Sequence, residues 1–242
     1  MSDYTPRTYT MREYQDNPPA AQPSGFVVGV DLGQSKDYTA IAVVERVMTH
    51  TLLDSGDIKE EVNIHLRHLE RPPLGTKYPV IVKRAIDLLN RPPLTRETPL
   101  VVDKTGVGGA VIDMFTAAGV QPEAVTITGG DAVIHESHHW KVPKRELVGN
   151  LVALNQTRRL KVAEGLDLVP ALINELVNFK IKIDLKSGHD SYEAWRESVH
   201  DDLVLAVSMA CWYAENRPAP IQFLDPEVAD LIQNGWERYV YE

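Results

Sequence analysis

The sequence predicts an α/β fold in which a mixed β-sheet is flanked by helices. Two patterns support this prediction. Between residues 26 and 69, three strand-like segments follow one another with no helical pattern between them, which is typical of an antiparallel meander. From residue 100 onward, short apolar runs alternate with helical patterns, which is typical of strands joined by helices. With 242 residues, the chain suits one domain of this kind.

The meander and one helix occupy the first part of this domain. Residues 26–31 form a continuous apolar run, as expected for a buried strand, and residues 38–47 contain a second. Residues 61–69 alternate apolar and polar side chains, which indicates a half-exposed strand. Residues 78–90 place apolar side chains at helical intervals, and the following Pro92 predicts the end of that helix.

The second part contains the alternating elements. Residues 100–103 and 124–128 are short and apolar, so we expect strands there. The segment between them has helical spacing over residues 107–118 and a C-cap candidate in Gly119. The remaining expected elements are helices over residues 144–159, 168–179 and 201–215, and a hairpin arm over residues 179–184.

We expect the domain to span residues 25–220, between two tails. Residues 1–24 are polar and contain four prolines, which predicts a disordered Pro-rich tail or linker, and residues 221–242 are expected to form a C-terminal tail. No stretch has the length and apolarity of a membrane span, and no signal peptide is recognisable. The single cysteine, Cys211, excludes an internal disulfide and a multi-cysteine zinc site. We therefore expect a cytoplasmic protein without a membrane partner.

The charge pattern gives a mixed indication about nucleic acid. The net charge of −9 argues mildly against such a partner, which favours basic proteins. Between residues 138 and 186, however, nine Lys or Arg face five acidic residues. We expect weak, salt-sensitive DNA binding through this basic window, with the following contributors among others: Lys141, Lys144, Arg145, Arg158 and Arg159.

Four carboxylates stand where local structural patterns begin or end. Asp31 and Asp103 each close an apolar strand pattern, and the pair Asp201 and Asp202 opens the last helical pattern. Side chains at the carboxyl ends of strands meet at one edge of an open α/β sheet, where ligands bind. Carboxylate oxygens are the ligands that Mg²⁺ prefers, so this arrangement predicts a site for Mg²⁺ or Mn²⁺.

Structural explanations compete with this interpretation. Asp201 and Asp202 at a helix start would also serve as an N-cap and as a favourable charge near the helix dipole. Asp37 lies six residues after Asp31 on the returning turn, where it either reaches a metal or is only a turn residue. The presence of Asp31 and Asp103 at two strand ends favours the metal site.

The same residues resemble a known family. Residues 26–33 with Asp37 and Thr39, and residues 101–108, resemble the first two nuclease motifs of phage terminase large subunits. Val142-Pro143-Lys144 before a helix and His200-Asp201-Asp202 before an apolar helix are similar to later segments of that family. The resemblance runs from residue 26 to about residue 215 and implies a ribonuclease-H-like fold.

The resemblance implies metal-dependent endonucleolytic cleavage of concatemeric viral DNA during genome packaging. In such a two-metal mechanism, Mg²⁺ or Mn²⁺ ions activate the attacking water and stabilise the leaving oxygen. Asp31 would bridge the two ions, while Asp103 and Asp202 would each bind one. Asp201 would share that work or cap the helix, and Asp37 would be a further ligand. The phosphate contacts implied are Lys36 and Lys104.

The sequence departs from the family in one respect, since it lacks the motif of the family's ATPase motor. A complete large terminase carries an ATPase motor, whose phosphate-binding loop ends in Gly-Lys-Ser or Gly-Lys-Thr, and this chain contains no Gly-Lys dipeptide. We therefore expect an excised nuclease domain or a stand-alone nuclease. Its expected partners are double-stranded DNA, a terminase ATPase motor on another chain, the small terminase subunit and the portal.

Three other functions remain open at this stage. Asp31-Leu32-Gly33-Gln34-Ser35 also resembles the first phosphate loop of actin-type and Hsp70-type kinases and ATPases, although no late adenosine loop is recognisable. A Holliday-junction resolvase would share the fold and the metals but bind a branched substrate. A module that holds DNA without cutting would not need the carboxylates.

Overall fold

The computed structural model describes residues 7–12, 25–33, 37–106, 108–178 and 200–216. In these ranges, nine strands form one mixed sheet with the order β1-β4-β3-β2-β5-β6-β8-β7, and β9 pairs with β4 off this path. Strands β2, β3 and β4 are antiparallel neighbours, whereas β2, β5, β6 and β8 run parallel. The predicted α/β class and its ribonuclease-H-like mixed sheet are confirmed.

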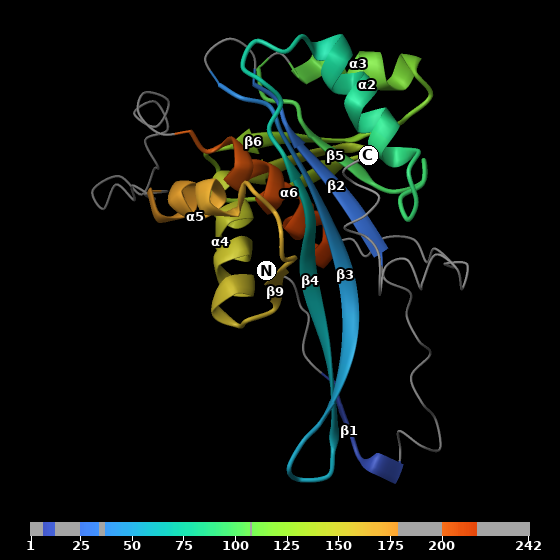
Figure 1. Ribbon diagram of the computed structural model, residues 1–242, viewed down its shortest axis with the longest axis vertical. Helices are drawn as coiled ribbons and strands as arrows, with labels where there is room; N and C mark the ends of the chain where they lie inside the picture. The colour runs from blue at the N-terminus through green and yellow to red at the C-terminus, as the bar shows by residue number, and fades with distance from the viewer. Residues whose placement is uncertain (1–6, 13–24, 34–36, 107, 179–199, 217–242) are drawn as a thin grey trace.

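The meander is longer than the sequence pattern predicted. It consists of β2 (Gly25–Asp31), β3 (Ala40–Leu52) and β4 (Ile58–Glu70). The far halves of β3 and β4 leave the body of the molecule as a long arm (Figure 1). At the end of this arm β4 pairs with β1 (Arg7–Tyr9), a strand that lies within the segment expected to be a disordered tail. Pairing with a distant strand, rather than local composition, produces β1.

The sheet contains three strands after β6 that the sequence pattern did not predict. Strands β5 (Leu100–Asp103) and β6 (Glu123–Thr128) occupy the expected positions. They are followed by β7 (Ile134–Glu136) and β8 (His139–Pro143), which form a hairpin at the sheet edge. A ninth strand, β9 (Leu160–Val162), pairs parallel to β4. Strands β7 and β9 have three residues each, too short for a periodic signal.

Helices cover both faces of the sheet (Figure 1). One face packs against α2 (Tyr78–Leu89) and α3 (Gly108–Ala117). The other packs against α4 (Lys144–Gln156), α5 (Val169–Asn178) and α6 (Asp202–Asn216). All five were predicted to within a few residues, while the hairpin arm expected at residues 179–184 lies outside the described ranges. None of the described helices is long and apolar enough to cross a bilayer.

Helix α6 lies directly against the middle of β2 and β3. It is buried on nearly every side, because β2 and β3 cover one flank and α4 and α5 cover others. Gly29 in β2 permits this close approach: a Cβ atom there would lie 2.3 Å from the carbonyl oxygen of Ala206 and 3.0 Å from Cβ of Ala210. The residue type at position 29 therefore sets the distance between α6 and the sheet.

We expect Gly29→Val to lower the free energy of unfolding by more than about 2 kcal/mol, because α6 would have to move away from β2. Urea unfolding followed by circular dichroism measures this change. Gly149→Ala is the matched control, since a Cβ atom at Gly149 in α4 would meet nothing within 4 Å. The control should gain up to about 1 kcal/mol from helix propensity. Equal stability of both variants would show that α6 does not depend on Gly29.

Candidate active site

Asp31 and Asp103 lie side by side at the carboxyl ends of two neighbouring parallel strands. Val30 of β2 is paired in register with Val102 of β5, so the next residue of each strand is an aspartate. The two carboxyl groups are close enough that each affects the pKa of the other. Both residues are buried, with exposed fractions of 6% and 8%. The sequence prediction that two strand-end carboxylates meet at one edge of the sheet is therefore confirmed.

The turn after β5 orients Asp103. The backbone N–H of Thr105 donates to Oδ1 of Asp103 at 2.8 Å, which closes a local turn on the carboxylate. The hydroxyl of Thr105 in turn accepts a hydrogen bond from the N–H of Ile127 at 3.0 Å. Thr105 thus connects the carboxylate to β6, a role that the sequence did not suggest.

Asp202 is the first residue of α6 and brings a third carboxylate to the site. It is only 3% exposed, and its Oδ2 atom accepts no hydrogen bond within the described part of the chain. The ring nitrogen Nδ1 of His200 lies 3.7 Å from that atom. A buried carboxylate oxygen without a hydrogen-bond partner is costly, so its presence indicates a site shaped for something other than stability.

Burial raises the pKa values of all three carboxylic acids, and repulsion from neighbouring carboxylates adds to this effect at Asp31 and at Asp202. The pKa of Asp31 lies well above its ordinary value because of burial first and the charges of Asp103, Asp202 and Asp201 next. Burial also raises the pKa of Asp103, against hydrogen bonds from Thr105 that lower it. The pKa of Asp202 is raised to about 6, again mainly by burial. The charges of Asp103 and Asp202 both act on Asp31, so the three carboxylates belong to one cluster.

The donor atoms fit a hard divalent cation. Three buried carboxylates provide oxygen ligands, and a cation among them would relieve both their repulsion and their desolvation. Across the described residues, however, no group of three or more His, Cys, Asp or Glu side chains is arranged to hold one ion. The assignment of Asp31, Asp103, Asp201, Asp202 and Asp37 as metal ligands thus remains a prediction.

The other predicted site residues lie at the margin. Asp201 is half-buried, and its Oδ2 atom accepts a hydrogen bond from Nζ of Lys144 at 2.6 Å. Asp37 is exposed, yet its charge contributes to the raised pKa of Asp202. Lys104 is half-buried directly after Asp103, whereas Lys36 falls outside the described residues. Asp201 is therefore tied to a lysine, while Asp202 is buried among the carboxylates.

The first turn of α6 is capped by Glu175 of α5. Its Oε2 atom accepts hydrogen bonds from the N–H groups of Leu203 at 3.0 Å and Val204 at 3.2 Å. The expectation that Asp201 would fold back as the cap is therefore wrong, because a carboxylate from another helix takes these donors. The signal available in the sequence was an acidic residue three positions after Leu172, on the apolar face of an amphipathic helix.

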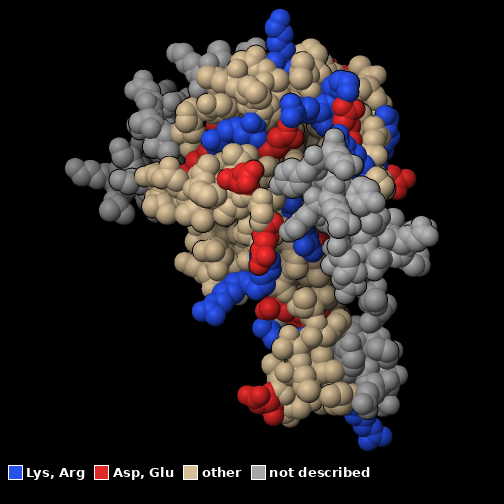
Figure 2. Space-filling view, in the orientation of Figure 1, with Lys and Arg blue, Asp and Glu red and all other residues tan. Residues whose placement is uncertain are grey.

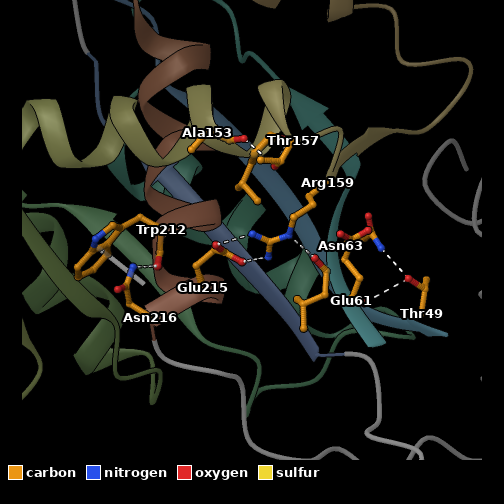
Figure 3. Close-up of polar contacts among 11 residues, drawn as sticks. Thr49, Glu61, Asn63, Ala153, Thr157, Arg159, Trp212, Glu215 and Asn216 are labelled. Atoms are coloured by element: carbon orange, nitrogen blue, oxygen red, sulfur yellow. Dashed lines mark hydrogen bonds and ion pairs between the residues drawn. The ribbon is translucent and has the colours of Figure 1, made fainter. Parts of the chain in front are cut away.

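Three cations of the predicted basic window are paired with acidic residues. Lys144 pairs with Asp201, and Arg145 pairs with Asp131. Arg159 is half-buried and donates to the carbonyl oxygen of Val62 at 2.7 Å. It also pairs with Glu215 (Figure 3). On the face shown in Figure 2, Lys and Arg side chains in the upper body lie interspersed with Asp and Glu. Arg159 is therefore held inside the protein by Glu215, whereas DNA contact by the other residues of the window stays a prediction.

Comparison with solved structures identifies the fold. The chain is similar to the large terminase nuclease from thermophilic phage G20c, with a TM-score of 0.51 and 21% identity over 79% of this chain and 82% of that one. The same nuclease with bound magnesium gives a TM-score of 0.51 and 21% identity over 78% and 80% of the two chains. Neither a protein-family model nor a curated protein sequence matches the chain. The predicted resemblance to terminase nucleases is thus confirmed at the level of the fold.

We expect Asp202→Asn to stabilise the metal-free protein at neutral pH. The raised pKa means that folded Asp202 holds its proton up to about pH 6, whereas the unfolded chain loses it near 3.8. The contribution of Asp202 to stability therefore falls as the pH rises between these values. In EDTA, the variant should match wild type near pH 4 and exceed it by about 1 to 3 kcal/mol at pH 7. Urea titrations at several pH values measure the difference; a variant less stable than wild type at every pH would contradict this assignment.

Proposed function

We propose that this protein is a metal-dependent DNA endonuclease that cuts concatemeric viral DNA during genome packaging. The observation that carries the proposal is the convergence of three buried carboxylates, from the ends of β2 and β5 and the start of α6. The likeness in fold to a large terminase nuclease, of which one structure contains magnesium, supports it. Carboxylates are required because a phosphodiester is itself anionic and must be joined to the protein through cations.

Each aspartate has a distinct task in this proposal. The charges of both other aspartates raise the pKa of Asp31, so Asp31 would bind both ions, while Asp103 and Asp202 would bind one each. When bound, Mg²⁺ or Mn²⁺ would supply an activated water and charge stabilisation at the leaving oxygen. Thr105 holds the Asp103 carboxylate in one orientation. Asp201 would tie Lys144 beside the site, and Asp37 would be an additional ligand from the turn after β2.

The biological setting follows from the same likeness. The substrate would be double-stranded DNA, and the partners would be a terminase ATPase motor, the small terminase subunit and the portal. The expected location is the cytoplasm of a phage-infected host cell. Without a motor to hold the DNA, cutting by the chain alone should be indiscriminate. It should also be sensitive to salt, because DNA binding through Lys and Arg is electrostatic.

The proposal is tested by incubating the pure protein with supercoiled plasmid in Mn²⁺, in Mg²⁺ and in EDTA. We expect nicking and linearisation with either metal and none in EDTA. Isothermal calorimetry with Mn²⁺ provides an independent measurement of metal binding. A protein that neither binds Mn²⁺ nor cuts plasmid would overturn the proposed function.

Asp31→Asn and Asp103→Asn should each abolish cleavage while the fold stays intact. Each replacement removes a charged metal ligand, yet also removes one of several crowded like charges. The metal-free variants should therefore be as stable as wild type or more so. Plasmid cleavage and thermal unfolding in EDTA measure the two effects. Wild-type cleavage rates in both variants would rule out these residues as ligands.

Asp202→Asn should remove activity almost completely, whereas Asp201→Asn should reduce it only in part. Asp202 is buried among the carboxylates, while Asp201 is half-buried and bonded to Lys144. Adjacent residues at the start of a helix point about 100° apart, so the two cannot aim at the same ion equally well. Cleavage rates under single-turnover conditions compare them. An equal loss in both variants would mean that the pair acts jointly.

A further inference from the structure

Arg71 and Glu175 form a buried ion pair beside the candidate active site. Nη2 of Arg71, which follows β4, donates to Oε1 of Glu175 in α5. The two side chains are 16% and 5% exposed. A buried ion pair costs desolvation and is weak evidence for stability, so its retention here calls for a reason other than stability.

Glu175 connects this pair to Asp202. One of its oxygens receives the Arg71 guanidinium, and the other accepts the N–H groups of Leu203 and Val204. These are the two residues that directly follow Asp202 in the first turn of α6. Because a backbone N–H and the preceding Cα belong to one rigid peptide plane, holding the N–H of Leu203 restrains the backbone of Asp202.

Arg71 is itself fixed from a second direction. Its guanidinium carbon lies 5.1 Å from the centre of the Tyr38 ring, and the same ring contacts His200 edge-on at 5.2 Å between centroids. Tyr38 comes from the segment that follows Asp31, and His200 precedes Asp201. Arg71 therefore contacts α5 and the segment after β2, and it is linked to the start of α6 through Glu175 and Tyr38.

We propose that Arg71 and Glu175 are positioning residues that set the orientation of Asp202 for metal binding. Glu175 holds the first turn of α6, and Arg71 holds the carboxylate of Glu175. Neither residue has to contact the metal or the DNA. The inference rests on the proposed function, and it adds to that function two side chains, one directly after β4 and one from α5, on which the third carboxylate depends.

A second ion pair on the same helix provides a matched control. At the other end of α6, Arg159 pairs with Glu215 in two hydrogen bonds (Figure 3). Its side chains are 13% and 5% exposed, almost the same as those of Arg71 and Glu175. Replacing either glutamate by glutamine leaves an arginine without its counter-charge against α6. Only Glu175, however, is bonded to the turn that begins with Asp202.

The test compares Glu175→Gln with Glu215→Gln in the full chain. Thermal unfolding in EDTA reports the structural cost, and calorimetry with Mn²⁺ alone reports metal affinity. We expect both variants to unfold at lower temperature than wild type, but only Glu175→Gln to weaken Mn²⁺ binding, by about tenfold, as is typical when a residue supporting a ligand is lost. Plasmid cleavage should fall in the same variant only. Equal Mn²⁺ affinities in Glu175→Gln and wild type would overturn the inference, and so would equal weakening in both variants.

Two further variants keep the test decisive. Arg71→Lys retains the positive charge but not the planar guanidinium, and should give an intermediate loss of Mn²⁺ affinity even if Glu175→Gln folds poorly. In an Asp202→Asn background, Glu175→Gln should have no further effect on Mn²⁺ binding, because the ligand that it positions is already gone. Additive losses in that double variant would overturn the positioning role while leaving the proposed function intact. Absence of Mn²⁺ binding by wild type would instead overturn the proposed function and the inference together.

Discussion

The close contact between α6 and β2 is the constraint on which the site depends. Asp31, Asp103 and Asp202 are far apart in the sequence, and only the placement of α6 across the sheet brings the third beside the other two. A glycine at position 29 lets the carbonyl oxygen of Ala206 approach the strand. Strand β2 is buried on both faces, by the cluster containing α6 on one side and by α2 and α3 on the other. Strand β2 therefore contributes side chains to both hydrophobic clusters and also ends in Asp31, the first residue of the site.

The carboxylate cluster opposes the stability that this packing provides. Burial raises the pKa values of all three acids, and repulsion from neighbouring carboxylates adds to this at Asp31 and Asp202, so the folded protein disfavours the charged forms of these groups. Nearby groups offset only part of this: Lys144 lowers the pKa of Asp31, and Thr105 lowers that of Asp103. Buried carboxylates that destabilise an otherwise well-packed core are typical of functional sites, where a bound cation neutralises their charge.

The sequence predicted what depends on local pattern and missed what depends on distant contacts. The continuous apolar run of β2, the helical spacing of α2 and the strand-end positions of Asp31 and Asp103 can be read within a few residues. Strand β9 has three residues and exists because β4 lies beside it. Likewise, Arg159 looked like part of a basic surface, because its partners Glu215 and Val62 are 56 and 97 residues away. Glu175 was missed for the same reason, since its hydrogen-bonded amides lie 28 and 29 residues later.

Helix α6 is held at both ends by arginine–glutamate pairs, and these pairs restrict how far the helix can rotate or shift. Its apolar surface alone would secure it against the sheet, since ten of its 12 buried residues are apolar. Apolar packing tolerates small rotations and shifts along the helix axis, whereas hydrogen bonds to defined atoms do not. The pair of Arg159 and Glu215 fixes the end of the helix, and the pair of Arg71 and Glu175 fixes its start. Because a helix turns about 100° per residue, even a slip by one position would carry Asp202 away from Asp31 and Asp103. The polar contacts at the two ends therefore supply the register that the hydrophobic core cannot specify.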